Sequence, residues 1–159
     1  MSGTWRHLPA PARAMAVGVS RAVEAAQQHD RVAYAEAVGQ LGAMDPAQVS
    51  LVLGATVRLL LEQRHPDGLA GEDVGAVLRR CVRGAAGWQP DVDPHLILVL
   101  LAGALGIHDP DAEGPPAGPG VLAGHAALVV ADLLEGQDRR LADYLGAAFQ
   151  EIERAERHD

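Results

Sequence analysis

Two nearly uninterrupted apolar stretches decide the fold of this chain: residues 96–107 (LILVLLAGALGI) and residues 121–134 (VLAGHAALVVADLL). Each is shorter than the ~20 apolar residues that a helix needs to span a bilayer. Each also has too few polar positions to lie on a protein as an ordinary amphipathic helix. The pair therefore predicts a buried helical hairpin, either at the centre of an all-α domain or at a subunit interface.

The segments around this hairpin also follow helical periodicity. Asp45-Pro46 and Asp93-Pro94 each place a capping carboxylate before a proline, which is favoured at the first helical position because its missing N–H is not needed there. Asp30 is a third candidate cap. The predicted helices occupy residues 11–28, 31–41, 46–64, 71–86, 94–107, 121–134 and 138–157.

These patterns predict one all-α domain, a bundle of about six to seven helices over residues 11–159. Residues 1–10 are expected to form a flexible N-terminal arm. The Pro- and Gly-rich segment 108–120 (HDPDAEGPPAGPG) is expected to be a mobile loop.

Composition limits the classes of function. The chain has 159 residues, of which 48% are hydrophobic and 3% aromatic, so we expect one aliphatic core. The net charge of -8 argues against nucleic acid and against an anionic membrane surface as partners. One cysteine excludes an internal disulfide, and neither a signal-like stretch nor a membrane span is evident. A cytoplasmic protein is expected.

His125 is the main candidate for a binding residue, because it lies within the apolar stretch 121–134. A buried imidazole needs a hydrogen-bond partner. It could contact a ligand in a pocket, or it could be a core or interface histidine bonded to a backbone carbonyl. Asp132 lies seven residues later, on the same helical face but two turns away. These two residues are the predicted pocket candidates.

The fourth predicted helix carries the cysteine and a basic patch. Cys81 falls on its apolar stripe, which predicts a small core residue rather than a nucleophile. Arg79, Arg80 and Arg83 lie on its polar side. They could bind a phosphate or an acidic partner, but we expect Arg80 or Arg83 to reach acidic groups of neighbouring segments.

Two acidic segments are considered as metal sites. Residues 109–114 match the opening of a calcium loop, but Gly120 stands where a bidentate glutamate should close the shell. Residues 91–95 (DVDPH) offer two carboxylates and an imidazole without a second ligand cluster. Helix capping explains Asp93 and Pro94. We therefore predict no metal and no cofactor.

Three functional hypotheses follow. The first is a non-enzymatic helical interaction module that self-associates as a homodimer, because three of the predicted helices have almost no polar face. The second is a small-molecule-binding or sensing domain with a pocket near His125 and residues 108–120 as a lid. The third is a hydrolase-type enzyme that uses His125 or residues 91–95.

Overall fold

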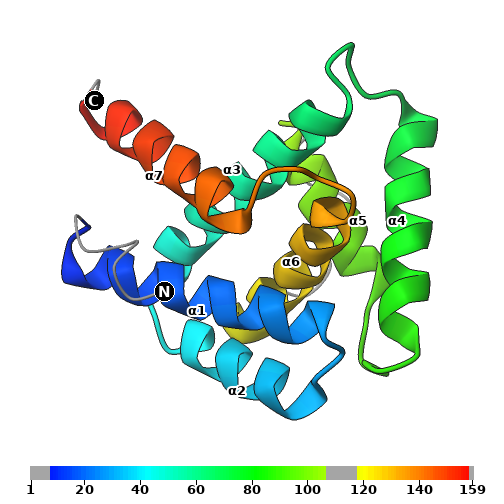
Figure 1. Cartoon of the computed structure of the whole chain (residues 1–159), viewed down its shortest axis with the longest axis horizontal. Coiled ribbons are helices and arrows are strands. Elements are labelled where there is room, and N and C mark those ends of the chain that lie inside the picture. The colour runs from blue at the N-terminus through cyan, green and yellow to red at the C-terminus, as the bar shows by residue number, and fades with distance from the viewer. Residues whose placement is uncertain (1–7, 107–117, 158–159) are drawn as a thin grey trace.

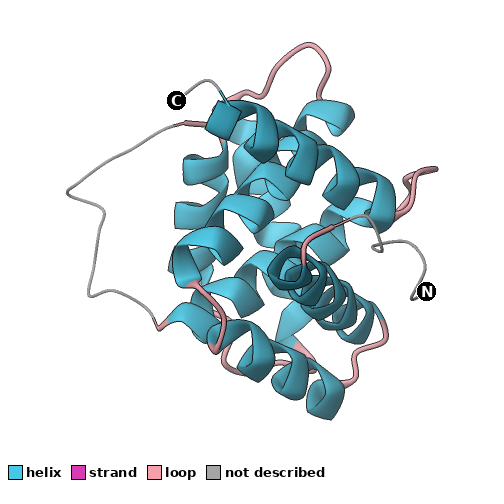
Figure 2. Ribbon diagram, turned by 90° about the vertical axis from the view of Figure 1, so that its left-hand side faces the viewer, coloured by secondary structure: helices cyan, strands magenta, loops and turns pink. Residues whose placement is uncertain are grey.

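The computed structural model describes residues 8–106 and 118–157, and within these ranges the chain forms seven α-helices and no strand. The predicted all-α class is confirmed, and helices joined by short loops make up most of the described structure (Figures 1 and 2). The helices are α1 (Ala10–Gln27), α2 (Arg31–Gly42), α3 (Pro46–Arg64), α4 (Gly71–Ala86), α5 (Pro94–Ala104), α6 (Pro119–Leu134) and α7 (Leu141–Arg157).

Aspartate side chains cap three of these helices, as the sequence predicts. Asp30 accepts a hydrogen bond from a backbone N–H of α2 at 3.1 Å. Asp45 accepts two from the first turn of α3, at 3.0 and 3.4 Å, and Asp93 accepts one from α5 at 2.9 Å. These bonds satisfy N–H groups that have no partner inside the helix, so they explain where the three helices begin.

Helix α6 lies in the middle of the molecule (Figure 1) and packs against α1, α2, α3, α4 and α5. All residues from 123 to 131 are buried. The segment is rich in alanine and valine, so neighbouring helices can approach it closely from several sides. The apolar stretch 121–134 is therefore the core helix of the domain.

Helix α5 is buried along one side only. Ile97, Leu101 and Ala104 face the core, where α5 packs against α3, α4 and α6. Leu98 on another side of α5 is 43% exposed. The expected buried hairpin is thus found only in part: residues 123–131 of α6 are buried, whereas Val121 at its start and the outer side of α5 are exposed.

Glycines allow α2 and α6 to cross closely. A Cβ atom added at Gly42 would lie 3.1 Å from the Cα of Gly120. A Cβ at Gly124 would lie 2.8 Å from the hydroxyl of Tyr34 and 3.2 Å from Val38. Contacts below 3.0 Å are not tolerated without movement, so this crossing depends on the missing side chain of Gly124.

Two arginines connect other helices to α6. Arg80 of α4 donates from Nε to both oxygens of Asp132 at 3.1 and 3.0 Å, and its Nη2 lies 2.9 Å from Oδ2. Arg64, the last residue of α3, donates to the backbone carbonyls of Leu133 and Glu135. It thereby satisfies carbonyls at the C-terminal end of α6, where cations are also favoured.

Within the two described ranges, no helix is long and apolar enough to cross a membrane. The predicted mobile loop and the calcium-loop comparison fall mainly on residues 107–117, which lie outside the described residues, as do residues 1–7 of the predicted arm. Residues that the prediction assigned to the ends of these segments are helical: α1 already starts at Ala10, and α6 already starts at Pro119.

Candidate functional site

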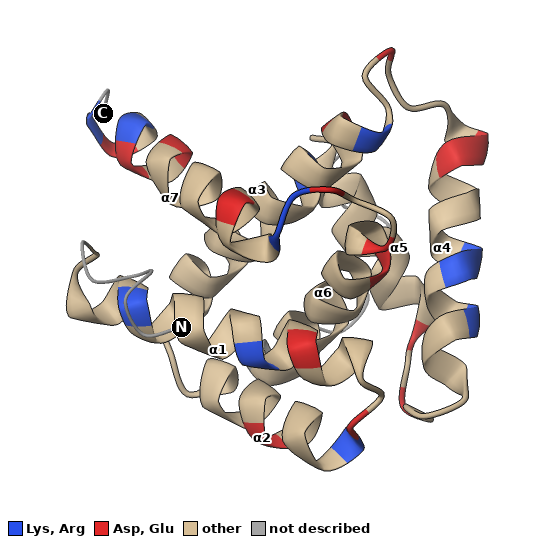
Figure 3. Ribbon diagram, viewed as in Figure 1, with Lys and Arg blue, Asp and Glu red and all other residues tan. Residues whose placement is uncertain are grey.

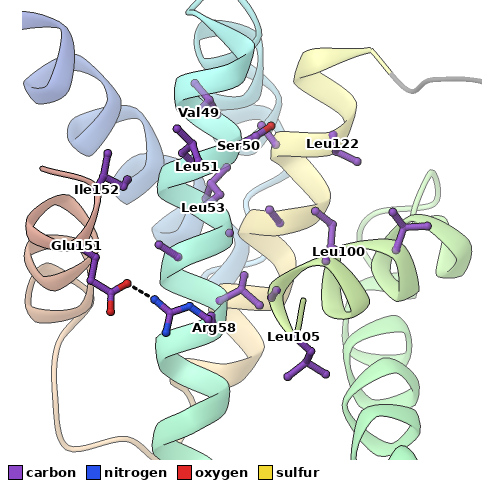
Figure 4. A pocket seen from close by; sticks show the side chains of 18 of the residues that line it. Val49, Ser50, Leu51, Leu53, Arg58, Leu100, Leu105, Leu122, Glu151 and Ile152 are labelled. Atoms are coloured by element: carbon purple, nitrogen blue, oxygen red, sulfur yellow. Dashed lines mark hydrogen bonds and ion pairs between the residues drawn. The ribbon is translucent and has the colours of Figure 1, made fainter. Parts of the chain in front are cut away.

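A mainly apolar cavity of about 890 Å³ lies in the described part of the chain. Its floor and walls come from α3, α5, α6 and α7, with one residue from α2 (Figure 4). Leu51 and Leu53 of α3, Leu100 of α5, Leu122 of α6 and Ile152 of α7 are typical of its lining. A cavity of this volume lies within the ~300–1,000 Å³ that small-molecule sites occupy.

The outward face of α3 forms the centre of this lining. Leu51, Gly54, Ala55 and Arg58 follow one another at helical spacing along it. Gly54 and Ala55 have little or no side chain, so they leave space between the neighbouring helices. Leu51 is 51% exposed, so part of the aliphatic surface of this face is open to solvent. The face is therefore apolar, recessed and accessible.

Three charged side chains border the cavity among the described residues: Arg58, Glu62 and Glu151. Arg58 donates from Nη1 to Glu62 Oε1 at 2.9 Å and from Nη2 to Glu151 Oε2, so it links α3 to α7 (Figure 4). One guanidinium is thus paired with two carboxylates, so the three side chains together carry a net charge of about -1.

The distribution of charge over the molecule agrees with this apolar site. Charged residues are spread over α1 to α4, α7 and the connections (Figure 3). Helix α5 has none and α6 has only Asp132, near its C-terminal end. The walls that α5 and α6 contribute to the cavity are therefore free of formal charge.

His125, the main candidate from the sequence, is 5% exposed and joins α6 to the start of α5. Its Nε2 accepts a hydrogen bond from the Asp93 N–H at 2.9 Å, and its Nδ1 lies 2.8 Å from the carbonyl oxygen of Val121. The network assigns the neutral tautomer with the proton on Nδ1. His125 does not line the cavity, although its neighbours Leu122, Ala123 and Ala126 do. A ligand-contacting role for it stays a prediction.

Asp132, the second candidate, pairs with Arg80 of α4, whereas the described hydrogen-bond partners of His125 are Asp93 and Val121. Its side chain is 10% exposed. The expectation that Arg80 or Arg83 reaches a neighbouring acid is thereby confirmed for Arg80. The hydrogen bond to Asp132 raises the pKa of Arg80 above its usual value, so the guanidinium stays charged.

A second, smaller hollow of about 270 Å³ lies between α1, α4 and α6, and Asp132 lines it together with Cys81, Trp88 and His29. Burial, and then the charge of Asp132, raise the pKa of Cys81 to about 12, although Arg80 opposes this shift. The thiol is therefore protonated at neutral pH, which fits the predicted core role and not that of a nucleophile.

Aromatic contacts close one side of this hollow. The ring of His29 stacks on Trp88 with centroids 5.5 Å apart, and Tyr34 meets Trp88 edge-on at 5.2 Å. His29 has a positive φ of 56° at the end of α1. The N–H groups of His29 and Asp30 bond to the carbonyls of Ala26 and Ala25, which is the pattern of a Schellman helix end. Trp88 thus ties the end of α4 to the turn between α1 and α2.

The cluster at residues 91–95 is used for helix capping. Asp93 accepts from the His95 N–H and donates its own N–H to His125. No group of three or more potential metal ligands comes together in the described ranges.

The cavity could not be found from the sequence, although its residues carried a signal. Gln48, Ala55, Arg58 and Glu62 follow helical spacing on the otherwise apolar α3, and three of the four border the cavity. Such a stripe is equally typical of a helix that merely touches water. Which helices lie beside this stripe of α3 depends on long-range packing, and no local sequence pattern encodes that packing.

Comparison with protein-family models, with characterised proteins and with solved structures finds no match for this chain. The functional argument therefore depends on the site itself.

Proposed function

We propose that this chain is a non-catalytic binding domain that takes a small apolar ligand into the cavity between α3, α5, α6 and α7. The observation that carries the proposal is a cavity of about 890 Å³ whose lining is mainly apolar, with Arg58, Glu62 and Glu151 at its border. Apolar surface exposed in one recessed patch is typical of ligand-binding sites, because burying it against a ligand is favourable.

The positions of the reactive side chains support a binding role over a hydrolase. Both ring nitrogens of His125 are occupied by backbone groups. The thiol of Cys81 is protonated at neutral pH. Neither residue borders the cavity. A general base has to lie within hydrogen-bond reach of its substrate, which these groups do not satisfy for a ligand in the cavity.

Self-association is the second candidate. It is favoured by large apolar side chains that are exposed outside the cavity: Leu98 at 43%, Val121 at 49% and, on α2, Val32 at 71%. The cavity itself is a poor two-fold interface, because a closed dimer needs a self-complementary patch and two facing hollows leave a void. A homodimer would thus use the outer sides of α5 and α6.

We also propose that the domain acts in the cytoplasm. The single cysteine of the chain, Cys81, is buried and free, which suits the reducing conditions of that compartment.

Light scattering at high micromolar concentration separates these two functions. Self-association predicts twice the mass of one chain, and Leu98→Glu together with Val121→Glu should return the protein to the monomer. A ligand-binding domain without self-association predicts a monomer at every concentration. A dimer that survives both substitutions would place the interface elsewhere.

The binding function is tested by filling the cavity. Gly54 borders it and has no atom within 4 Å of an added Cβ, so the first atom of a side chain meets no obstacle there and Gly54→Leu should occupy part of the hollow. Gly39→Leu on α2 is the matched control, since Gly39 is also helical and unobstructed but lies outside the lining. Both changes should raise helix stability by about 0.5–1 kcal/mol.

The readout is titration calorimetry with n-octanol as an apolar probe. We expect the wild type and Gly39→Leu to bind it and Gly54→Leu to give no measurable heat of binding. Equal binding by all three proteins would show that the probe enters elsewhere, and no binding to the wild type would overturn the proposed function.

A further inference from the structure

We propose that the ligand of the cavity carries a cationic, hydrogen-bond-donating head group next to its apolar body, as a primary alkylammonium does. This inference deepens the proposed function and rests on it. The evidence is the arrangement of Arg58, Glu62 and Glu151, the charged side chains that border the cavity in the described structure.

The first step concerns charge. Arg58 contributes one positive charge and the two glutamates contribute two negative charges, so a ligand head group at this position meets a net charge of about -1. The chain as a whole has a net charge of -8, which adds a long-range field of the same sign. A carboxylate or phosphate head group would thus be repelled, and a cation would be attracted.

The second step concerns hydrogen bonds. Arg58 uses Nη1 for Glu62 Oε1 and Nη2 for Glu151 Oε2. The other oxygen of each carboxylate, Glu62 Oε2 and Glu151 Oε1, accepts no hydrogen bond from the described residues. Carboxylates accept several hydrogen bonds each, whereas an ammonium group has three donors and no acceptor. The two remaining carboxylate oxygens at the cavity can therefore accept hydrogen bonds from a ligand whose head group is a donor.

The third step concerns position. Figure 4 shows Arg58 and Glu151 beside the aliphatic lining, at the side where α3 meets α7. Leu100, Leu105 and Leu122 line the cavity on the other side of α3. An amphiphile could place its head group at the glutamates and extend its chain along α3 toward α5 and α6.

The test uses calorimetry at low ionic strength to compare three probes that have eight carbon atoms each and differ in their head groups: n-octylammonium, n-octanol and octanoate. Because the carboxylates are partly exposed, we expect n-octylammonium to bind about two- to fivefold more tightly than n-octanol. Octanoate should bind most weakly. Raising the salt concentration should reduce these differences, since exposed charges are screened.

The decisive variant is Glu62→Gln together with Glu151→Gln, which leaves Arg58 without a carboxylate partner. The order should then reverse, with octanoate tighter than n-octylammonium. The control, Glu36→Gln with Glu72→Gln, has the same net charge but changes exposed residues outside the cavity, and it should keep the wild-type order.

The outcomes separate the two proposals. If n-octanol binds in the cavity and the charged probes show no order, or the order is the same in both double variants, the head-group inference is overturned while the binding function stands. If Gly54→Leu binds n-octanol as the wild type does, or no probe binds the wild type, the proposed function fails and the inference fails with it.

Discussion

The imidazole of His125 links α6 to the start of α5 through one hydrogen bond and makes a second hydrogen bond within α6. It accepts from the Asp93 N–H, which belongs to the residue that caps α5, and it bonds to a carbonyl one turn earlier in α6. A side chain that satisfies such groups stabilises the fold chiefly because its loss leaves them unpaired.

We therefore expect His125→Leu to lower the free energy of unfolding by about 1–3 kcal/mol. Urea or thermal unfolding measures this. His95→Leu is the control, because His95 is exposed and should change stability by no more than about 0.5 kcal/mol. A His125→Leu protein as stable as the wild type would show that these two bonds contribute little.

His29 adopts a left-handed backbone conformation that favours glycine. Its ring stacks on Trp88, so a simple substitution would remove a contact and relieve strain together. His29→Ala and His29→Gly both lose the stack, but only the second relieves the strain. We expect the glycine variant to be more stable than the alanine variant by about 1 kcal/mol. Equal melting temperatures would contradict the assigned conformation.

Cys81 should resist thiol reagents in the native protein. Its pKa of about 12 compares with a usual value of 9.0, so the reactive thiolate is rare at about pH 8. We expect iodoacetamide to label native Cys81 at least about a hundredfold more slowly than the urea-unfolded chain. Similar rates in both states would contradict its burial.

The same pKa shift predicts how stability depends on pH. The folded thiol keeps its proton above the pH at which the unfolded thiol loses it. The contribution of Cys81 is thus fully present below about pH 9 and declines as the pH rises toward about 12. Cys81→Ala should show a smaller decline over that range than the wild type.

At the scale of elements, the crossing of α2 and α6 depends on Gly124. Its missing Cβ leaves room for the Tyr34 hydroxyl, and Tyr34 cannot move freely because it packs against Trp88. Gly124→Ala should lower stability by about 1–3 kcal/mol through overpacking, in spite of the better helix propensity of alanine.

Gly39→Ala provides the comparison, since an added Cβ there meets nothing within 4 Å. It should raise stability by about 0.5–1 kcal/mol. Chemical denaturation of both variants gives the two values. If both changes raise stability, the two helices do not cross as closely as the structure shows.

The elements themselves were largely predictable from the sequence. Asp30, Asp45 and Asp93 are local signals, and each caps the helix that it was expected to cap. The pairing of helices was not predictable in the same way. Arg80 or Arg83 was expected to reach an acid of a neighbouring segment, but only the packing of α4 on α6 shows that the pair is Arg80 and Asp132.

For the whole molecule, the uneven burial of the three most apolar helices explains the site. Helix α6 is buried from residue 123 to residue 131, whereas α3 and α5 keep large apolar side chains at the surface, because a chain of 159 residues cannot cover all of them. The excess of apolar surface was evident in the sequence. Whether it would form a hollow or a flat face was not, since that depends on how α5 and α7 flank α3.

Native mass spectrometry of the protein, purified from its own cells without detergent, tests the central claim most directly, because it reads subunit number and bound mass together. We predict a chain that carries an additional small-molecule mass, which Gly54→Leu loses and Gly39→Leu keeps. A wild-type protein without any bound mass, or one whose bound mass is unaffected by Gly54→Leu, would contradict the assignment of the cavity as the binding site.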